Sequence, residues 1–425
     1  MSAAEGPEAC WVPVPAHARS GGAAPDEDEA AAGVLSGALD WLDAHLEWFA
    51  PHRWERFLPG RPFRPGPLLE LLGLVRLLDR SGRLPKDADL PSRALDLAEQ
   101  AAAEPDFDRG LRRADALFPY HLNLIALLEL LGRPQPALRT RGAGLLAAGA
   151  GAHAQPYKPV LGRIELRYFL DRGGFRAPAA LPDVAALFRE SLPALHPDVL
   201  HLTESETYAL THALFYVTDF GDRDVLGGAK EAARLRETVR VLLAVHLARG
   251  ALDLVAELLL CATALGSPSA SLVRDGWSAL ARARRPDGAV PSPVHRPEVL
   301  AGLTGDKAAA YLFGTCYHTT LAAGLAAAVR HGRGAAGRAA HRAVCGPRLP
   351  CAAPEEILCW AREAAQAPPS SRAAWAAHLA PVLVLCVQAR DLPVLTQVLR
   401  AAEALGHGDA PVVRSAAAYA SAQSR

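Results

Sequence analysis

Tyrosine and histidine recur together near the start of apolar segments of this chain. The pairs are Tyr120 with His121, Tyr208 with His212 four residues later, and Tyr317 with His318. Imidazole groups exchange protons near neutral pH, so such histidines serve as general acids and bases. If each segment is a helix, its N-terminus also offers unpaired N–H groups that favour an anionic ligand or a neutral histidine. A packed wall, in which every polar group has a partner, is the alternative interpretation.

Acidic residues lie beside the second pair. Thr203 followed by Glu206 has the pattern of a helix capping box, which accounts for both residues structurally. Glu204 has no such explanation, so it joins His212 as a candidate for acid–base chemistry, with a structural role as the alternative.

Further acidic residues crowd the predicted C-terminal end of the same helix, at Asp219, Asp222 and Asp224. The helix dipole disfavours negative charge there, so a metal, a cationic ligand or the nearby Arg223 has to offset it. An ion-paired or solvated loop is the plainer alternative. The segment lacks the glycine placement and terminal glutamate of an EF-hand calcium loop.

Cys316 and His318 are residue types that bind zinc. Two positions apart in one helix they point about 200° apart, so both bind one ion only if Cys316 precedes the helix. We therefore predict no metal ligands and no cofactor, with a divalent metal as the alternative. The predicted catalytic residues are His212, His318, Tyr208, Tyr317 and Glu204. The predicted substrate-binding residues are Tyr120, His121, Cys316 and Asp219.

Helices are the elements that must position these residues. Apolar residues recur at three- and four-residue steps in the segments 68–82, 120–132, 162–174, 207–221, 252–266, 316–332 and 373–391. More highly charged segments, such as 235–250 and 271–288, alternate with them. No segment shows the sustained two-residue alternation of a strand, so we expect almost no sheet.

The repeat of roughly 40 to 50 residues is typical of one helical hairpin per unit. We predict an all-α fold of repeated hairpins, an (α/α)6-like toroid whose inner helices bring the tyrosines and histidines to one mouth. An open α-solenoid is the alternative. Residues 1–33, rich in Ala, Gly, Pro and acid, are predicted to be a disordered tail, and 34–425 a single domain.

Composition argues against several classes of partner. Lys plus Arg and Asp plus Glu are balanced at 45 each, so no general charge attracts nucleic acid or a membrane surface. The 7 cysteines include no CxxC pair, which favours a reducing cytoplasm over a disulfide framework. The start of the chain lacks the features of a signal peptide, and we expect no membrane-spanning run.

One part of the chain resembles a known architecture. The segments LVRDGWSALARARRPDGAV and CYHTTLAAGLAAA, within residues 270–330, resemble the repeats of terpene-cyclase and protein-prenyltransferase toroids. The resemblance implies a zinc-binding role for His318. However, the Asp-x-Cys pair of the prenyltransferases and the Asp-x-Asp-Asp motif of the triterpene cyclases are absent, and Arg284 and Val290 replace Gln and Trp. The resemblance therefore implies a shared architecture with these families rather than shared chemistry. As a whole, the chain resembles uncharacterised actinobacterial proteins with a domain of unknown function.

Functional hypotheses follow from the repeat and its polar residues. The first is a bacterial enzyme of specialised metabolism that acts on a small or peptide-derived substrate in a central cavity, with His212 or His318 as general acid or base. The second is a non-catalytic helical-repeat module that binds a peptide or protein partner. The third is a metal-dependent cyclase or transferase. Phosphate-binding loops, dinucleotide fingerprints and HExxH motifs do not occur in the sequence.

Overall fold

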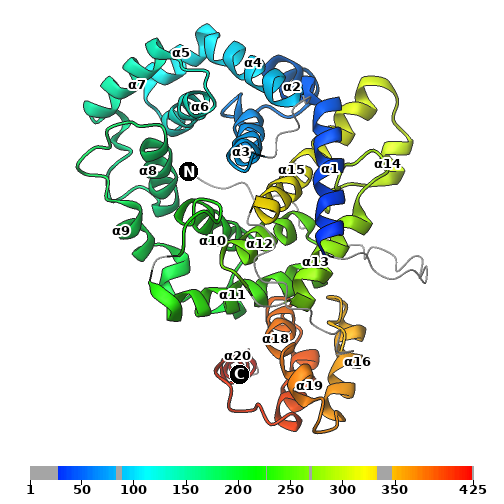
Figure 1. Ribbon diagram of the computed structural model, residues 1–425. Coiled ribbons are helices and arrows are strands. Elements are labelled where there is room, and N and C mark those ends of the chain that lie inside the picture. The colour runs from blue at the N-terminus through cyan, green and yellow to red at the C-terminus, as the bar shows by residue number, and fades with distance from the viewer. Residues whose placement is uncertain (1–26, 83–88, 226, 268–269, 333–346, 424–425) are drawn as a thin grey trace.

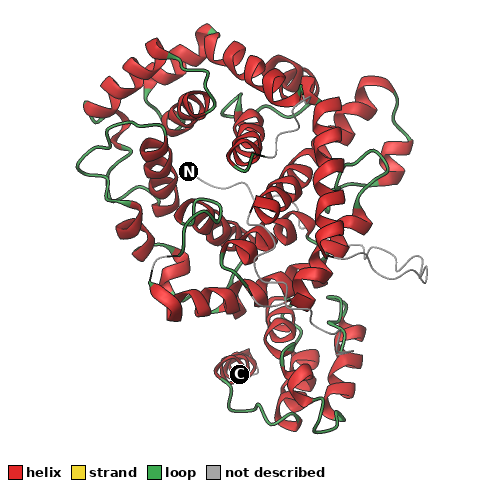
Figure 2. Ribbon diagram, in the orientation of Figure 1, coloured by secondary structure: helices red, strands yellow, loops and turns green. Residues whose placement is uncertain are grey.

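The computed structural model describes residues 27–82, 89–225, 227–267, 270–332 and 347–423. Every regular element in those ranges is a helix, and Figure 2 shows no strand among them. The predicted all-α class is therefore confirmed. The apolar periodicity of the sequence, at three- and four-residue steps, explains why helices form throughout.

Apolar helices surround the centre of the molecule in a closed cycle (Figure 1). Each contacts the next along the chain, and the last contacts the first. Among the described residues, these inner helices are α3 (Gly66–Arg80), α6 (Phe118–Leu130), α8 (Val160–Arg172), α10 (Glu204–Val217), α12 (Leu252–Ala264) and α15 (Gly305–Gly332). The run Leu254–Cys261 of α12 is buried all round, as expected for a helix with neighbours on every side.

A second layer of helices covers the outside of this cycle (Figure 1). Its members, among the described residues, are α1 (Glu27–Ala44), α4 (Leu90–Ala103), α5 (Pro105–Arg113), α7 (Pro136–Ala147), α9 (Val184–Arg189), α11 (Gly228–Arg249) and α13 (Ala270–Ala283). In α4, the buried residues Leu90, Ala94 and Ala98 recur at four-residue steps and form one apolar stripe. Short helices complete the connections: η1 (Leu46–Phe49), α2 (Pro51–Phe57), η2 (Ala150–Ala152), η3 (Leu192–Leu195), η4 (Val199–His201) and α14 (Pro297–Ala301).

Helix α1 starts earlier than the sequence predicts. It begins at Glu27, inside the segment 1–33 that we expected to be a disordered tail. Acidic residues in a first turn suit the helix dipole, and Arg330 of α15 pairs with Glu27 at 2.6 Å and with Asp28 at 2.8 Å. The remainder of that predicted tail, residues 1–26, lies outside the described residues.

Helix α15 also differs from its prediction, because it begins at Gly305 and not near residue 316. The preceding segment contains Lys307 and three consecutive alanines at 308–310, which favour helix. Tyr317 and His318 therefore lie in the middle of a long helix, and the dipole argument does not apply to them.

Contrary to our expectation, α15 has the length and composition to cross a membrane, as one such helix among the described residues. Most of its apolar stretch is buried inside the protein, where it contacts α1, α3 and α12. This burial is typical of the central helix of a protein core.

The C-terminal segment packs outside the cycle. It contains α16 (Pro354–Ala365), α17 (Arg372–Ala376), α18 (Leu379–Gln388), α19 (Leu392–Ala404) and α20 (Pro411–Gln423). The predicted apolar helix 373–391 is divided there into α17 and α18. The buried side chains of this segment form a second core with Val241 and Val245 of α11.

Replacing Gly288 by Ala should destabilise the protein more than replacing Gly266 by Ala. Both glycines have positive φ, +96° and +61°, so each substitution costs about 1 kcal/mol in the backbone. A Cβ on Gly288 would also overlap the backbone of Gly37 in α1, whereas one on Gly266 meets no atom within 4 Å. In urea unfolding we expect losses of about 3 kcal/mol and about 1 kcal/mol respectively. Equal losses would contradict this close approach.

Candidate functional site

The inner helices line a cavity of about 570 Å³ at the centre of the cycle, which is partly open to solvent. Its polar lining residues, in the described part of the chain, are Arg61, Glu70, Tyr120, Asn123, Glu165, His212, Tyr216, Glu257 and His318. The remaining wall is mainly apolar and includes Phe63, Phe169, Phe215, Phe220, Leu260 and Leu321. A mostly apolar cavity with a few converging polar groups is typical of a small-molecule site.

Buried carboxyl groups are the main chemical feature of this cavity. Glu70 of α3, Glu165 of α8 and Glu257 of α12, here called the cavity glutamates, all line it. Burial raises the pKa of each carboxyl, because the charged form loses its hydration. A carboxyl with a raised pKa holds its proton closer to neutral pH and is able to donate it to a bound molecule.

Glu257 and His212 form one polar cluster on the wall. The Thr211 hydroxyl donates to Oε2 of Glu257 at 2.5 Å, and Nδ1 of His212 lies 3.6 Å from the same oxygen. Nδ1 also lies 2.8 Å from the Tyr208 carbonyl oxygen, which only accepts, so Nδ1 carries the proton. In the neutral ring Nε2 then has the lone pair and is the basic atom.

Glu165 lies in a second cluster. The side-chain amide of Asn123 donates through Nδ2 to Oε1 of Glu165 at 2.9 Å, and Tyr216 also hydrogen bonds to this carboxyl. Burial raises the pKa of Tyr216 well above its usual value, so its hydroxyl keeps its proton and donates. Oδ1 of Asn123 has no hydrogen-bond partner among the described residues.

Glu70 is the least partnered of the cavity glutamates. Its Oε2 is buried and has no hydrogen-bond partner in the part of the chain that the structure describes. Burial raises its pKa, against smaller opposing effects of His318 and Arg61. The Arg61 guanidinium stacks 4.2 Å from the Trp54 ring centroid and donates to the Tyr317 hydroxyl.

The structure brings together some of the residues that the sequence predicts. His212, His318 and Tyr120 line the cavity, so candidates from three separate segments meet there. Their neighbours do not line it. His121 is buried against the ring of Phe107, with centroids 4.7 Å apart. Tyr317 is buried against the rings of Trp54 and Phe313, with centroids 5.3 Å away in each case.

Two predicted residues of α10 lie outside the cavity lining. The Tyr208 hydroxyl donates to Asp253, while Glu204 is exposed in the first turn of α10. The predicted capping box is confirmed, because Thr203 accepts from the Glu206 amide and Glu206 accepts from the Thr203 amide.

Asp219 anchors the C-terminal ends of α3, α8 and α10. It is 2% exposed, accepts from the Tyr168 hydroxyl at 2.6 Å, and pairs with Arg80 at 3.1 Å, with Arg76 at 3.4 Å and with Arg172. Burial would raise the pKa of Asp219, but the hydrogen bond from Tyr168 and the arginine charges together lower it.

These arginines supply the positive charge that the sequence required at this helix end. They come from other helices, whereas Asp222, Arg223 and Asp224 are exposed. The ion pairs account for Asp219 structurally.

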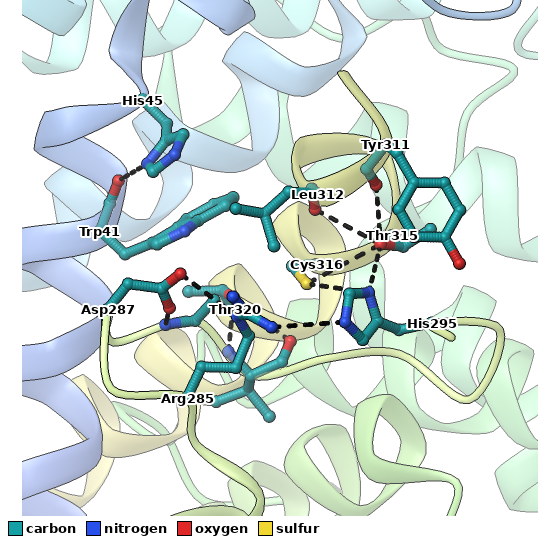
Figure 3. Close-up of polar contacts among 12 residues, drawn as sticks. Trp41, His45, Arg285, Asp287, His295, Tyr311, Leu312, Thr315, Cys316 and Thr320 are labelled. Carbon is teal, nitrogen blue, oxygen red and sulfur yellow. Dashed lines mark hydrogen bonds and ion pairs between the residues drawn. The ribbon is translucent and has the colours of Figure 1, made fainter. Parts of the chain in front are cut away.

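Cys316 lies in a separate cluster that fastens the loop before α14 to α15 (Figure 3). Its Sγ is 3.9 Å from Nδ1 of His295, and that nitrogen is 2.8 Å from the Thr315 hydroxyl. Burial raises the pKa of Cys316 to about 11 and lowers that of His295, so thiol and imidazole are both neutral. Cys316 is fully buried and does not line the cavity. Among the described residues, no group of three or more His, Cys, Asp or Glu side chains is arranged to hold a metal ion.

The sequence carries a signal for the residues that the tyrosine and histidine pattern misses. Each cavity glutamate interrupts an apolar helix, in the segments LLELLGL, RIELRYF and VAELLLC, and Asn123 does so in YHLNLIALL. A charged or amide group flanked by buried leucines is costly unless it has a partner or faces a cavity. A polar residue within the apolar stretch of an inner helix is therefore expected to line the central cavity.

Comparison with known proteins gives a family and no assigned activity. The model of a family described as a domain of unknown function (DUF6895) matches residues 35–328. This range covers the inner helices from α3 to α15 and their cavity. No curated protein and no solved structure matches the chain. The resemblance of residues 270–330 to terpene cyclases and prenyltransferases therefore gains no support.

Replacing Glu70 by Gln should stabilise the protein in alkaline solution. Because the folded-state pKa of Glu70 is raised, the folded protein loses stability as the pH rises through that pKa. Gln keeps the shape without the charge, so we expect a gain of about 1 kcal/mol near pH 8 that vanishes near pH 4. Urea unfolding at both pH values measures this gain. The matched control is Glu403→Gln, at an exposed position of α19, and a gain at both pH values would contradict the explanation.

Replacing Asp219 by Asn should destabilise the protein at neutral pH, which is the opposite of the effect expected for Glu70→Gln. The lowered pKa of Asp219 stabilises the fold above the unfolded-state pKa, and this contribution disappears as the pH falls through the folded-state pKa. We expect a loss of about 3 kcal/mol near pH 7, because the substitution removes the buried charge that pairs with three partly exposed arginines. Thermal and urea unfolding of Asp219→Asn beside the exposed Asp222→Asn tests this. Similar stabilities for the two variants would show that the ion pairs contribute little.

Proposed function

This chain belongs to the DUF6895 family, and we propose that its central cavity is the active site of an acid–base enzyme acting on a small or peptide-derived substrate. The observation that carries the proposal is that a histidine and a carboxyl whose pKa is raised by burial line the same cavity. His212 and Glu70 are those groups. They come from α10 and α3, which the Asp219 ion pairs join directly.

His212 acts as the general base in this proposal. Its Nδ1 proton is bonded to the Tyr208 carbonyl, so Nε2 is the atom that accepts a proton from the substrate. The imidazolium that forms favours the carboxylate form of Glu257, 3.6 Å from Nδ1, and this carboxylate in turn stabilises it. Thr211 holds that carboxyl in place through its hydroxyl.

Glu70 acts as the general acid. Burial raises its pKa and so favours the protonated carboxyl, and Oε2, which has no partner among the described residues, is the atom able to deliver the proton. Transfer to the substrate leaves a carboxylate that the charges of His318 and Arg61 stabilise. One proton leaves the substrate for His212 and another arrives from Glu70, so the reaction class is proton transfer, as in an isomerisation or elimination.

The cavity favours this function over the alternatives. A volume of about 570 Å³ lies within the range of small-molecule sites. An interaction module would present an apolar groove to its partner, whereas this cavity gathers polar groups inside a cycle of helices. A metal-dependent cyclase or transferase needs a set of ligands, and His318 has no such set around it among the described residues. A cytoplasmic role in bacterial specialised metabolism remains part of the proposal.

The proposal can be tested with a bacterial extract. The protein is incubated with the extract, and all compounds are followed by mass spectrometry. We expect the protein to convert at least one compound, and His212→Gln and Glu70→Gln each to slow that conversion by about 10²-fold or more. The exposed Glu403→Gln is the matched control and should convert the compound at the parent rate.

Two results would overturn the proposal. Conversion by His212→Gln at the parent rate would show that the chemistry occurs without this base. A parent protein that retains compounds from the extract but converts none would identify the cavity as a binding site.

A further inference from the structure

The cavity has two sides with different chemistry. Glu257, His318 and Glu70 lie on α12, α15 and α3, which are consecutive in the cycle of helices. The opposite side consists of α6, α8 and α10, and it carries Asn123, Glu165 and Tyr216. The proposed proton transfer uses His212 together with residues of the first side. It assigns no role to the hydrogen-bonded group of Asn123, Glu165 and Tyr216.

The second side presents one hydrogen-bond acceptor without a partner in the described part of the chain, Oδ1 of Asn123. Asn123 is 1% exposed, and its Nδ2 donates to Glu165. This bond fixes the orientation of the amide, so Oδ1 is the free atom, and it has no partner in the described part of the chain. A buried acceptor left without a donor costs about 1 to 3 kcal/mol. A ligand that brings N–H or O–H groups removes this cost.

The charge balance of the lining favours a positive ligand. The charged and titratable groups that face the cavity are Glu70, Glu165, Glu257, His212, His318 and Arg61, with Tyr120 and Tyr216. The Arg61 guanidinium is already engaged with Trp54 and the Tyr317 hydroxyl. The carboxyl of Glu165 accepts hydrogen bonds from Asn123 and Tyr216, and among its described neighbours His212 is the group whose positive charge acts on it.

Aromatic rings surround this second side. Tyr216 and Phe169 have ring centroids 6.0 Å apart, and Tyr216 and Phe220 have theirs 6.1 Å apart. All three residues line the cavity. Aromatic faces attract cations by about 0.5 to 2 kcal/mol, most strongly where water is excluded.

We propose that the substrate carries a protonated amine, which binds between Oδ1 of Asn123 and the carboxyl of Glu165 against the rings of Tyr216 and Phe169. The ammonium N–H groups donate to both oxygens, and the positive charge of the amine favours the carboxylate form of Glu165, with which it pairs. This inference rests on the proposed function, because it names the substrate class of the same cavity. It also assigns a role to Asn123 and Glu165 of α6 and α8, which hold the amine, while His212 of α10 and Glu70 of α3 transfer the protons.

Three small ligands that share a carbon skeleton but differ in charge test whether the cavity prefers a cation. They are 2-phenylethylamine, 2-phenylethanol and phenylacetate, which carry a cation, a neutral donor and an anion. In calorimetric titrations at neutral pH, we expect the amine to bind about tenfold more tightly than the alcohol, and the anion more weakly than both. Equal or tighter binding of the alcohol or the anion would overturn the inference. An amine that fails to bind at millimolar concentration would do so as well.

Variants of Glu165 and Asn123 locate the bound amine. Glu165→Gln removes the charge and keeps the shape, so it should bring the amine to the affinity of the alcohol while alcohol binding stays unchanged. Unchanged alcohol binding shows that the variant is folded. Asn123→Ala should weaken the binding of both the amine and the alcohol, because each donates to Oδ1. The exposed Glu403→Gln should change the binding of neither. Full amine preference in Glu165→Gln would overturn the assignment.

The same measurements separate this inference from the proposed function. Amine preference that persists in His212→Gln, in a protein that converts no compound, would reject the enzyme and retain the amine site. Conversion of compounds without an amino group, lost in His212→Gln, would retain the enzyme and reject the amine site.

Discussion

One buried carboxylate sets the geometry of the centre of this protein. Asp219 joins the C-terminal ends of α3, α8 and α10 through Tyr168 and three arginines, Arg76, Arg80 and Arg172. The same helices carry Glu70, Glu165 and His212 one or two turns towards their N-termini. A shift of any of these helices would separate charges in a buried place, which is strongly unfavourable. The ion pairs of Asp219 lie outside the cavity, and they fix the positions of Glu70 and His212 relative to each other.

The cavity itself works against stability. Carboxyl groups without full sets of partners lie inside a core that is otherwise apolar, and apolar replacements would pack there at lower cost. Asp219 and the extensive apolar contacts of the inner helices offset this cost. Functional sites commonly have groups that a stable core would not retain.

The sequence predicts the helices well because their apolar periodicity is strong, and the inner segments begin within a few residues of their predicted starts, α15 excepted. It predicts the site less well for a geometric reason. Neighbouring residues of a helix point about 100° apart, so only one of each adjacent pair faces the cavity. Tyr120 and His318 do so, whereas His121 and Tyr317 face neighbouring helices. The partners of Asp219 lie far away in sequence, and no local pattern identifies them.

The contact between α3 and α15 closes the cycle, and it joins segments that are more than 200 residues apart in the chain. During synthesis on the ribosome, α3 emerges long before α15, and the apolar surface that α15 will cover stays open meanwhile. The early helices are able to form hairpins, but no complete cavity exists until α15 has been made. A nascent chain stopped before residue 305 therefore exposes a core surface, of the kind that chaperones bind.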